Sequence, residues 1–262
     1  MARVLSALVL IPVVVGTVWF LPPLATLALA TIVAVLAFVE YASIVRALDV
    51  HVPAAIAAIA VGGACIAVGT SLVSIDILLM TAVIVVGALA VASGVPRPGV
   101  LHDATAAVFA VLYIGMPLGA LAAVRTLAGR EAVLLLMLTI VVSDTAQYYC
   151  GRAFGRRPLA PTISPKKTLE GAIGGLVFGT AAMIVGGRYV FPTADLLLLV
   201  LVSASISALG IVGDLFESLL KRSAGVKDSS QIIPGHGGVL DRIDSWLFAA
   251  PLYYAFVRYL RV

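Results

Sequence analysis

Carboxylate and basic side chains gather in a polar segment near the end of the sequence, residues 214–244. Asp241 and Asp244 stand three residues apart at the start of an apolar run, and on a helix this spacing places both carboxylates on one face. Such a pair predicts a Mg²⁺ site, because Mg²⁺ keeps several waters and takes further ligands from phosphates. Asp214 is the expected third ligand. The alternative is that Asp241 or Asp244 caps a helix.

The same segment supplies positive charge and glycine. Glu217 and Lys221 stand four residues apart, which favours an ordinary salt bridge between them, whereas Asp214 has no local cation. Glycines around His236 would let the backbone approach a ligand closely. We expect Lys221 and Arg222 to contribute to catalysis as well as to binding. The candidate residues for binding phosphate groups in this segment are Lys221, Arg222, Lys227, Asp228, His236, Gly237, Gly238 and Arg242.

A second polar segment, residues 144–170, begins with Asp144 inside an apolar run. An ionised carboxylate at the centre of a bilayer costs about 2.5–3.5 kcal/mol on insertion scales. Asp144 is therefore expected to face a cavity, a metal or a cation, and it is a candidate for both catalysis and metal binding. The alternative is a structural pair with an arginine such as Arg152.

The run Ser164-Pro165-Lys166-Lys167-Thr168 precedes an expected helix, whose N-terminus also favours an anion. This predicts a phosphate cradle formed by Ser164, Lys166, Lys167 and Thr168. In the alternative interpretation Ser164 is the helix N-cap, Pro165 opens the first turn, and the lysines only orient the chain in the membrane. Glycines 171, 174 and 175 more often indicate close helix packing than contact with a nucleotide.

The two segments resemble the phosphatidate cytidylyltransferase family. The residues from Ser218 to Asp244, with Ser-Leu-Leu-Lys-Arg, Lys-Asp and Pro-Gly-His-Gly-Gly-Val-Leu-Asp-Arg-Ile-Asp, are similar to the family signature, and Ser-Pro-Lys-Lys-Thr-Leu-Glu-Gly from Ser164 is similar to a second block. The resemblance implies transfer of CMP from CTP to phosphatidic acid, giving CDP-diacylglycerol and pyrophosphate for phospholipid biosynthesis. It also implies a Mg²⁺-dependent site made of Asp214, Asp241 and Asp244, with Asp144 nearby as a fourth candidate ligand. We expect one or two cations in this site.

Two other functions share some of these features. A CTP-dependent kinase of a polyprenol would also bring nucleotide, metal and lipid together, but it would release CDP. A secondary transporter could use Asp144 and interrupted helices as a substrate site. The transporter is disfavoured because the second half of the chain does not mirror the first and the charges gather at one membrane face.

The elements that must position these residues are membrane helices. Of the 262 residues, 62% are hydrophobic and only 11% are charged, with a mean hydropathy of +1.15, which excludes an ordinary soluble domain. The pattern predicts an all-α polytopic membrane protein, with Pro22-Pro23 splitting the first apolar run into two helices. We expect about nine transmembrane helices, near residues 4–20, 24–45, 52–72, 76–94, 104–124, 131–150, 171–190, 195–219 and 244–260.

An N-in, C-out topology follows from the positive-inside rule, and it places both polar segments on the cytoplasmic side of a bacterial inner membrane. The first apolar run is expected to be a retained helix and not a signal peptide. We predict a single membrane domain, 1–262, with N-terminal spans in 1–130 and a catalytic half in 131–262. The expected partners are CTP, phosphatidic acid and membrane lipids, without nucleic acid, and small residues along the spans would permit a homodimer.

Overall fold

The computed structural model describes residues 2–92, 94, 96, 98–233, 235 and 237–260. Helices dominate, as predicted, and one short antiparallel hairpin lies within the first polar segment. The elements are α1 (Ala2–Phe20), α2 (Pro23–Arg46), α3 (Ala54–Thr70), α4 (Ile75–Ala92), α5 (Val100–Ala110), the π-helical turn η1 (Val111–Gly115), α6 (Met116–Phe154), β1 (Pro158–Ala160), β2 (Ser164–Thr168), α7 (Leu169–Val190), α8 (Leu196–Ser223) and α9 (Leu240–Tyr259).

Proline and glycine set the two most informative helix boundaries. Pro22 is the extended N-cap of α2 and Pro23 occupies its first turn, so the predicted split of the first apolar run is confirmed. The helical run from α5 through α6 is continuous except at Gly129, where φ is 87° and ψ is −177°. This backbone conformation is open to glycine, and it ends one helical piece where the sequence predicted a break between two spans.

Five helical segments in the described part of the chain are long and apolar enough to cross a membrane: α2, α4, the run Val100–Phe154, α7 and α8. Shorter apolar helices cover Leu8–Phe20 and Ala54–Thr70. Their outward side chains are largely aliphatic, with Leu24, Ile59 and Val91 among the most exposed. Such surfaces are typical of helices that face lipid.

The chain forms two compact units. The first consists of residues 1–123 and 223–242, and the second of 124–222 and 243–262. The loop of the second polar segment therefore clusters with the N-terminal helices, whereas the first polar segment belongs to the other unit.

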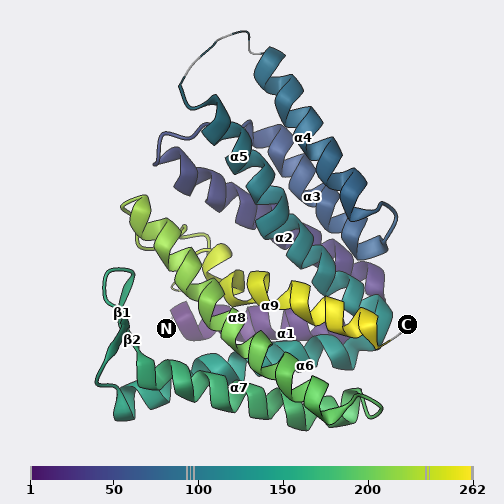
Figure 1. The fold of residues 1–262 in the computed structure, drawn as a ribbon, viewed down its shortest axis with the longest axis vertical. Coiled ribbons are helices and arrows are strands. Elements are labelled where there is room, and N and C mark those ends of the chain that lie inside the picture. Colours follow the sequence, from purple (N-terminus) through teal and green to yellow (C-terminus); the bar gives the residue numbers. More distant parts are fainter. Residues whose placement is uncertain are drawn as a thin grey trace. The chain divides into compact units, whose positions relative to one another are not determined.

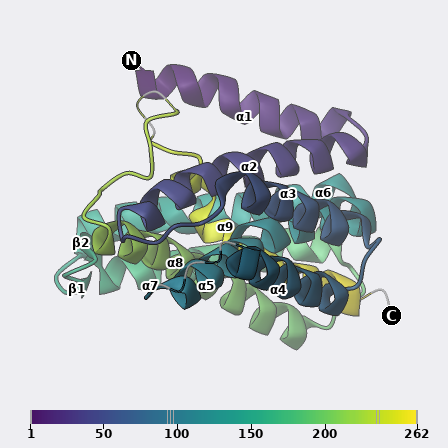
Figure 2. The same ribbon diagram turned by 90° about the horizontal axis from the view of Figure 1, so that it is seen from above.

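In the first unit, α1 lies beside α2 after a tight turn (Figure 2), and α2 packs on α3 around the buried Phe38 and Val61. The backbone of η1 and early α6 comes close to α3. A Cβ on Gly115 would lie 2.6 Å from the Val61 carbonyl oxygen, and one on Gly119 would lie 2.6 Å from that of Cys65. These two positions require glycine because any side chain would separate the helices.

In the second unit, glycines bring α7 and α8 close to their neighbours. A Cβ on Gly174 would lie 2.5 Å from the Cys150 sulfur, and one on Gly175 would overlap Gln147 Cγ. The interpretation of these glycines as packing residues is confirmed. Gly213 on α8 faces the Asp244 carbonyl oxygen of α9, 2.5 Å from where its Cβ would stand. The α8–α9 approach thus brings two residues of the second polar segment together.

Candidate active site

The first polar segment forms the hairpin and leads into α7. Strands β1 and β2 pair antiparallel, with Pro158 opposite Thr168 and Ala160 opposite Ser164, and the hairpin projects from the N-terminal end of α7 (Figure 1). Its base is closed by Glu170, whose carboxylate accepts hydrogen bonds from the backbone N–H groups of Arg156 (3.0 Å) and Arg157 (3.2 Å). The hairpin is therefore a fixed extension of the helix.

Thr168, not Ser164, is the N-cap of α7. The Thr168 hydroxyl accepts a hydrogen bond from the Gly171 N–H at 3.1 Å, while Ser164 begins β2. The alternative interpretation with Ser164 as N-cap is wrong, because strand pairing continues for four residues beyond Ser164. Thr168 also packs tightly against Gly155, where an added Cβ would lie 2.8 Å from its methyl group.

Lys167 joins the two polar segments. Its ammonium forms a salt bridge with the Asp214 carboxylate of α8, and the two side chains are 23% and 27% exposed. Sequence reasoning left Asp214 without a local cation, and the structure supplies one from the other segment. Asp244 lies close enough to Asp214, Asp144 and Lys167 to interact electrostatically with all three. Three predicted carboxylates and one predicted lysine thus share one site in the second unit.

Hydrogen bonds orient two of these carboxylates. Asp144 accepts from the Gln147 side-chain amide at 3.0 Å, and Asp244 accepts from the Ser245 N–H at 2.7 Å. Arg152, the alternative partner of Asp144, donates to the Tyr148 hydroxyl at 3.4 Å. Three neighbouring carboxylates therefore surround the ammonium of Lys167 and concentrate negative charge at this site.

Two other predicted basic residues of the second unit, Lys221 and Arg222, contact protein groups. Lys221 lies 2.6 Å from the Glu217 carboxylate, which is buried, so the predicted salt bridge is confirmed. Arg222 donates to the Ile163 carbonyl oxygen at 3.3 Å and thereby ties the end of α8 to the hairpin. Lys166 is exposed on β2, next to the half-buried Lys167.

The other predicted residues belong to the first unit. Lys227, Asp228 and Arg242 are exposed, and His236 lies outside the described residues. One oxygen of Asp241, Oδ2, accepts from the Gly238 N–H (2.7 Å) and from both the N–H (3.2 Å) and the hydroxyl (3.0 Å) of Ser229. Asp241 therefore holds the loop that precedes its own helix.

Gly237 and Gly238 have conformational and steric reasons to be glycine. Gly237 has a φ of +84°. An added Cβ on Gly238 would overlap both the Ser229 hydroxyl and a Glu40 carboxylate oxygen. The Gly238 backbone therefore lies close to two protein groups, the side chains of Ser229 and Glu40. From the sequence, these glycines were expected to let the backbone approach a ligand.

Glu40 is the residue that sequence reasoning missed. It lies on α2, only 1% exposed, and its carboxylate accepts four hydrogen bonds from the loop and the start of α9. A lone carboxylate in an apolar run was the available signal, the same one that drew attention to Asp144.

The carboxylates of the second unit suit a hard cation such as Mg²⁺, which prefers oxygen ligands. Across the described ranges, no three His, Cys, Asp or Glu side chains are placed to share one ion. Mg²⁺ in nucleotide enzymes usually binds one or two carboxylates and takes its remaining ligands from phosphates and water. The residues present therefore fit an ion that arrives with a nucleotide better than an all-protein metal cage.

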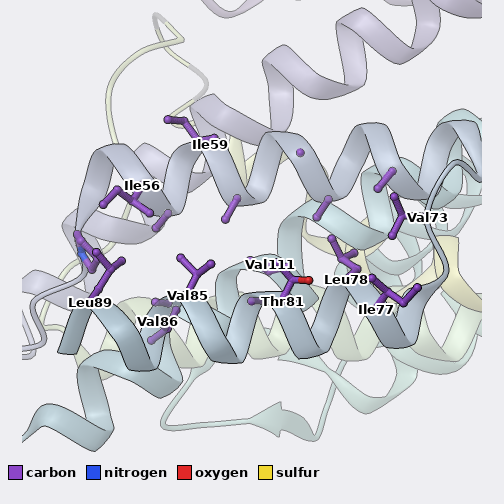
Figure 3. A pocket seen from close by; sticks show the side chains of 18 residues that line it. Ile56, Ile59, Val73, Ile77, Leu78, Thr81, Val85, Val86, Leu89 and Val111 are labelled. Atoms are coloured by element: carbon purple, nitrogen blue, oxygen red, sulfur yellow. The ribbon is translucent and has the colours of Figure 1, made fainter. Parts of the chain in front are cut away.

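An apolar groove of about 520 Å³ lies between α3 and α4 in the first unit, with side chains from both helices pointing into it (Figure 3). None of its lining residues is charged, and Thr81 contributes the one side-chain hydroxyl. This lining offers no group for acid–base or phosphate chemistry.

Comparison with known proteins identifies the family of the chain. The model of the cytidylyltransferase family matches residues 1–260. The chain is 43% identical over 150 residues to a phosphatidate cytidylyltransferase of Staphylococcus haemolyticus, covering 57% of each chain. It is 42% identical over 132 residues to one of Haemophilus influenzae (48% of this chain, 45% of the relative) and 39% identical over 158 residues to one of Helicobacter pylori (60% and 58%). The matched regions thus span about half the length of these relatives. Since the family model covers nearly every residue, the chain belongs to the cytidylyltransferase family.

Proposed function

We propose that this protein transfers CMP from CTP to phosphatidic acid, giving CDP-diacylglycerol and pyrophosphate. The observation that carries the proposal is the site in which Lys167 contacts Asp214 beside Asp244 and Asp144. Family membership and the names of three relatives support the same reaction.

In the proposed reaction an oxygen of the lipid phosphate attacks the α-phosphorus of CTP. A new P–O bond joins CMP to the lipid phosphate, and the bond from the α-phosphorus to pyrophosphate breaks. The lipid supplies the nucleophile, so the protein's tasks are to position two phosphate groups and to neutralise their charge. Lys167, fixed at the start of α7 by the hairpin and by Asp214, is the proposed ligand of the nucleotide phosphates. Lys166 lies next to it on the exposed side of β2.

Mg²⁺ is the proposed cofactor, with Asp214 and Asp244 as its protein ligands and Asp144 beside them. Asp241, the other expected ligand, is assigned instead to the loop that it holds through Ser229 and Gly238. When bound, Mg²⁺ would neutralise phosphate charge and the charge of the leaving pyrophosphate. The supporting observation is that Asp144, Asp214 and Asp244 lie close enough together to interact electrostatically, because clustered carboxylates attract a divalent cation and repel a triphosphate that arrives without one.

The proposed setting is a bacterial inner membrane, crossed by about nine helices with the N-terminus and the site on the cytoplasmic side. Five long apolar helical segments and two shorter ones support a polytopic protein. The basic residues of the hairpin and of the loop before α9 support a cytoplasmic site, because positive charge is retained on that side. Membrane lipids would surround the helices, and small residues on them would permit a homodimer.

The test is a product analysis of purified protein in mixed micelles with labelled CTP, phosphatidic acid and Mg²⁺. The proposal predicts that lipid-soluble cytidine and pyrophosphate appear together in equal amounts. Release of CDP with a newly phosphorylated lipid would instead identify a kinase. Absence of any CTP turnover would reject nucleotide chemistry and favour transport.

A further inference from the structure

Glu40 is a buried carboxylate that accepts hydrogen bonds from residues 229–240, far away in the sequence. Its Oε1 accepts from the Ser230 hydroxyl (2.5 Å) and the Val239 N–H (2.9 Å). Its Oε2 accepts from the Ser229 hydroxyl (2.9 Å) and the Leu240 N–H (2.7 Å). Two hydroxyls and two backbone N–H groups thus surround one carboxylate, with one of each kind on each oxygen.

Two of these donors belong to the N-terminus of α9. Helix N-termini leave backbone N–H groups without intrahelical partners, and the helix dipole there favours negative charge. Glu40 therefore caps α9 from another helix, a role that a residue within the loop usually performs. The capping group is a carboxylate, and hydrogen bonds to an ionised carboxylate are stronger than those to a neutral cap.

The Ser229 hydroxyl connects Glu40 to Asp241. Its oxygen lies 2.9 Å from Glu40 Oε2 and 3.0 Å from Asp241 Oδ2, so its single proton is shared between the two carboxylates, while the Ser229 N–H donates to Asp241 Oδ2. Gly238 completes the arrangement, because its N–H donates to Asp241 and its Cα leaves no room for a side chain beside Glu40. The position of the Asp241 carboxylate thus depends on groups that Glu40 holds.

We propose that Glu40 is a positioning residue for the nucleotidyl transfer. It anchors the loop formed by residues 224–239, called here the signature loop, and it fixes the first turn of α9 that carries Asp241. This inference rests on the proposed function for its catalytic consequence, while the anchoring itself follows from the hydrogen bonds alone.

The substitution Glu40→Gln separates the charge from the size of the side chain. A glutamine has one acceptor oxygen and one NH₂ donor. The serine hydroxyls can rotate to accept from the NH₂ group, but the Val239 and Leu240 N–H groups cannot. In either orientation of the glutamine side chain, its NH₂ group faces one of the two backbone N–H groups at the start of α9. That N–H group then loses its acceptor. The variant thus preserves volume and removes the cap from one N–H.

The experiment compares Glu40→Gln with Ser230→Ala, which removes one hydroxyl donor, and with the matched control Glu131→Gln, which alters an exposed glutamate paired with Arg130. Each protein is purified in detergent and checked for a monodisperse elution profile. Steady-state kinetics with CTP and phosphatidic acid give kcat and both KM values. Hydrogen exchange followed by mass spectrometry reports on peptides covering residues 224–245.

We expect Glu40→Gln to lower kcat about tenfold or more, as loss of a charge-assisted hydrogen bond implies, with both KM values within about threefold of the parent. Exchange in the signature loop should become at least about fivefold faster. Ser230→Ala should give a smaller change in the same direction, and Glu131→Gln should match the parent. If Glu40→Gln does not elute as a folded protein, Ser230→Ala tests the inference instead, through its kcat and the rate of hydrogen exchange in the signature loop.

Unchanged kcat, or lost activity without faster exchange in the loop, would overturn the inference. A parent protein that makes no lipid-linked cytidine would reject the proposed function instead. The exchange data would still show whether Glu40 anchors the loop.

Discussion

Replacing Lys167 by methionine tests the proposed nucleotide site most directly. Methionine keeps an unbranched apolar stem of similar length but carries no charge. The ammonium of Lys167 lies against Asp214, and both side chains are about three-quarters buried, so solvent screens this position less than it screens the exposed Lys166. The Lys167→Met variant both removes a phosphate ligand and leaves the Asp214 charge facing an incoming triphosphate.

The expected magnitude is that of a hydrogen bond between a charged donor and a phosphate oxygen. A hydrogen bond to a charged group contributes about 1.5–3 kcal/mol, which corresponds to about a 10- to 150-fold weaker affinity for CTP. The matched control is Lys166→Met on the same strand. Because Lys166 is solvent-exposed, its contribution should be about 0–1 kcal/mol, at most about fivefold in affinity.

The assay is equilibrium binding of labelled CTP in micelles, together with the KM for phosphatidic acid. Combining Lys167→Met with Asp214→Asn should show a coupling of about 0.5–3 kcal/mol, because the two side chains are in contact. The reasoning fails if Lys167→Met weakens CTP binding no more than Lys166→Met does. It fails equally if CTP affinity is unchanged while saturation by phosphatidic acid shifts.

Three further predictions concern the loop, the helix packing and the cation. Asp241→Asn should lower turnover about 10- to 150-fold at normal yield, because Oδ2 accepts from two backbone N–H groups and shares the Ser229 hydroxyl proton with Glu40. Full activity in the steady-state assay would remove Asp241 from the catalytic apparatus. In a thermal unfolding experiment, Gly213→Ala should lower the free energy of unfolding by about 1–3 kcal/mol, since its Cβ would lie 2.5 Å from the Asp244 carbonyl oxygen. The control Gly87→Ala, with open space around its Cβ, should leave the free energy of unfolding unchanged or raise it. A chelator should abolish turnover reversibly while leaving the melting temperature of the nucleotide-free protein unchanged, and a large drop in that temperature would indicate a structural metal instead.

Hydropathy predicted the helices well because each apolar run must satisfy its backbone hydrogen bonds internally. Pro22-Pro23 and Gly129 also mark breaks that the local sequence can signal by itself. The hairpin at 158–168 was not predicted, since two strands of three and five residues carry no periodic pattern. The N-cap of α7 is Thr168 and not Ser164, because the unpredicted strand β2 occupies residues 164–168.

The acidic site was partly predictable because its members are unusual in a membrane sequence. Asp144, Asp214 and Asp244 stood out as carboxylates near or within apolar runs, and the structure places them near one lysine. The pairing of Lys167 with Asp214 could not be predicted, because the two residues are far apart in the chain. Glu40 carried a signal of its own as a lone carboxylate in an apolar run, but its partners could not be predicted because they lie 189 to 200 positions away.

The π-helical turn η1 has a consequence for how the length of this chain can change during evolution. A π turn contains one residue more than the α-helical path it replaces, and each residue of an α-helix turns the following side chains by about 100°. Deleting one residue from 111–114 would therefore let a regular α-helical turn follow the same path, and Gly115 and Gly119 would stay on the face that touches Val61 and Cys65. Deleting one residue between Gly115 and Gly119, where the helix is regular, would instead rotate everything after it by about 100° and turn Gly119 away from Cys65. Among related proteins, a length change of one residue should therefore be tolerated within the π turn and excluded between residues 115 and 119.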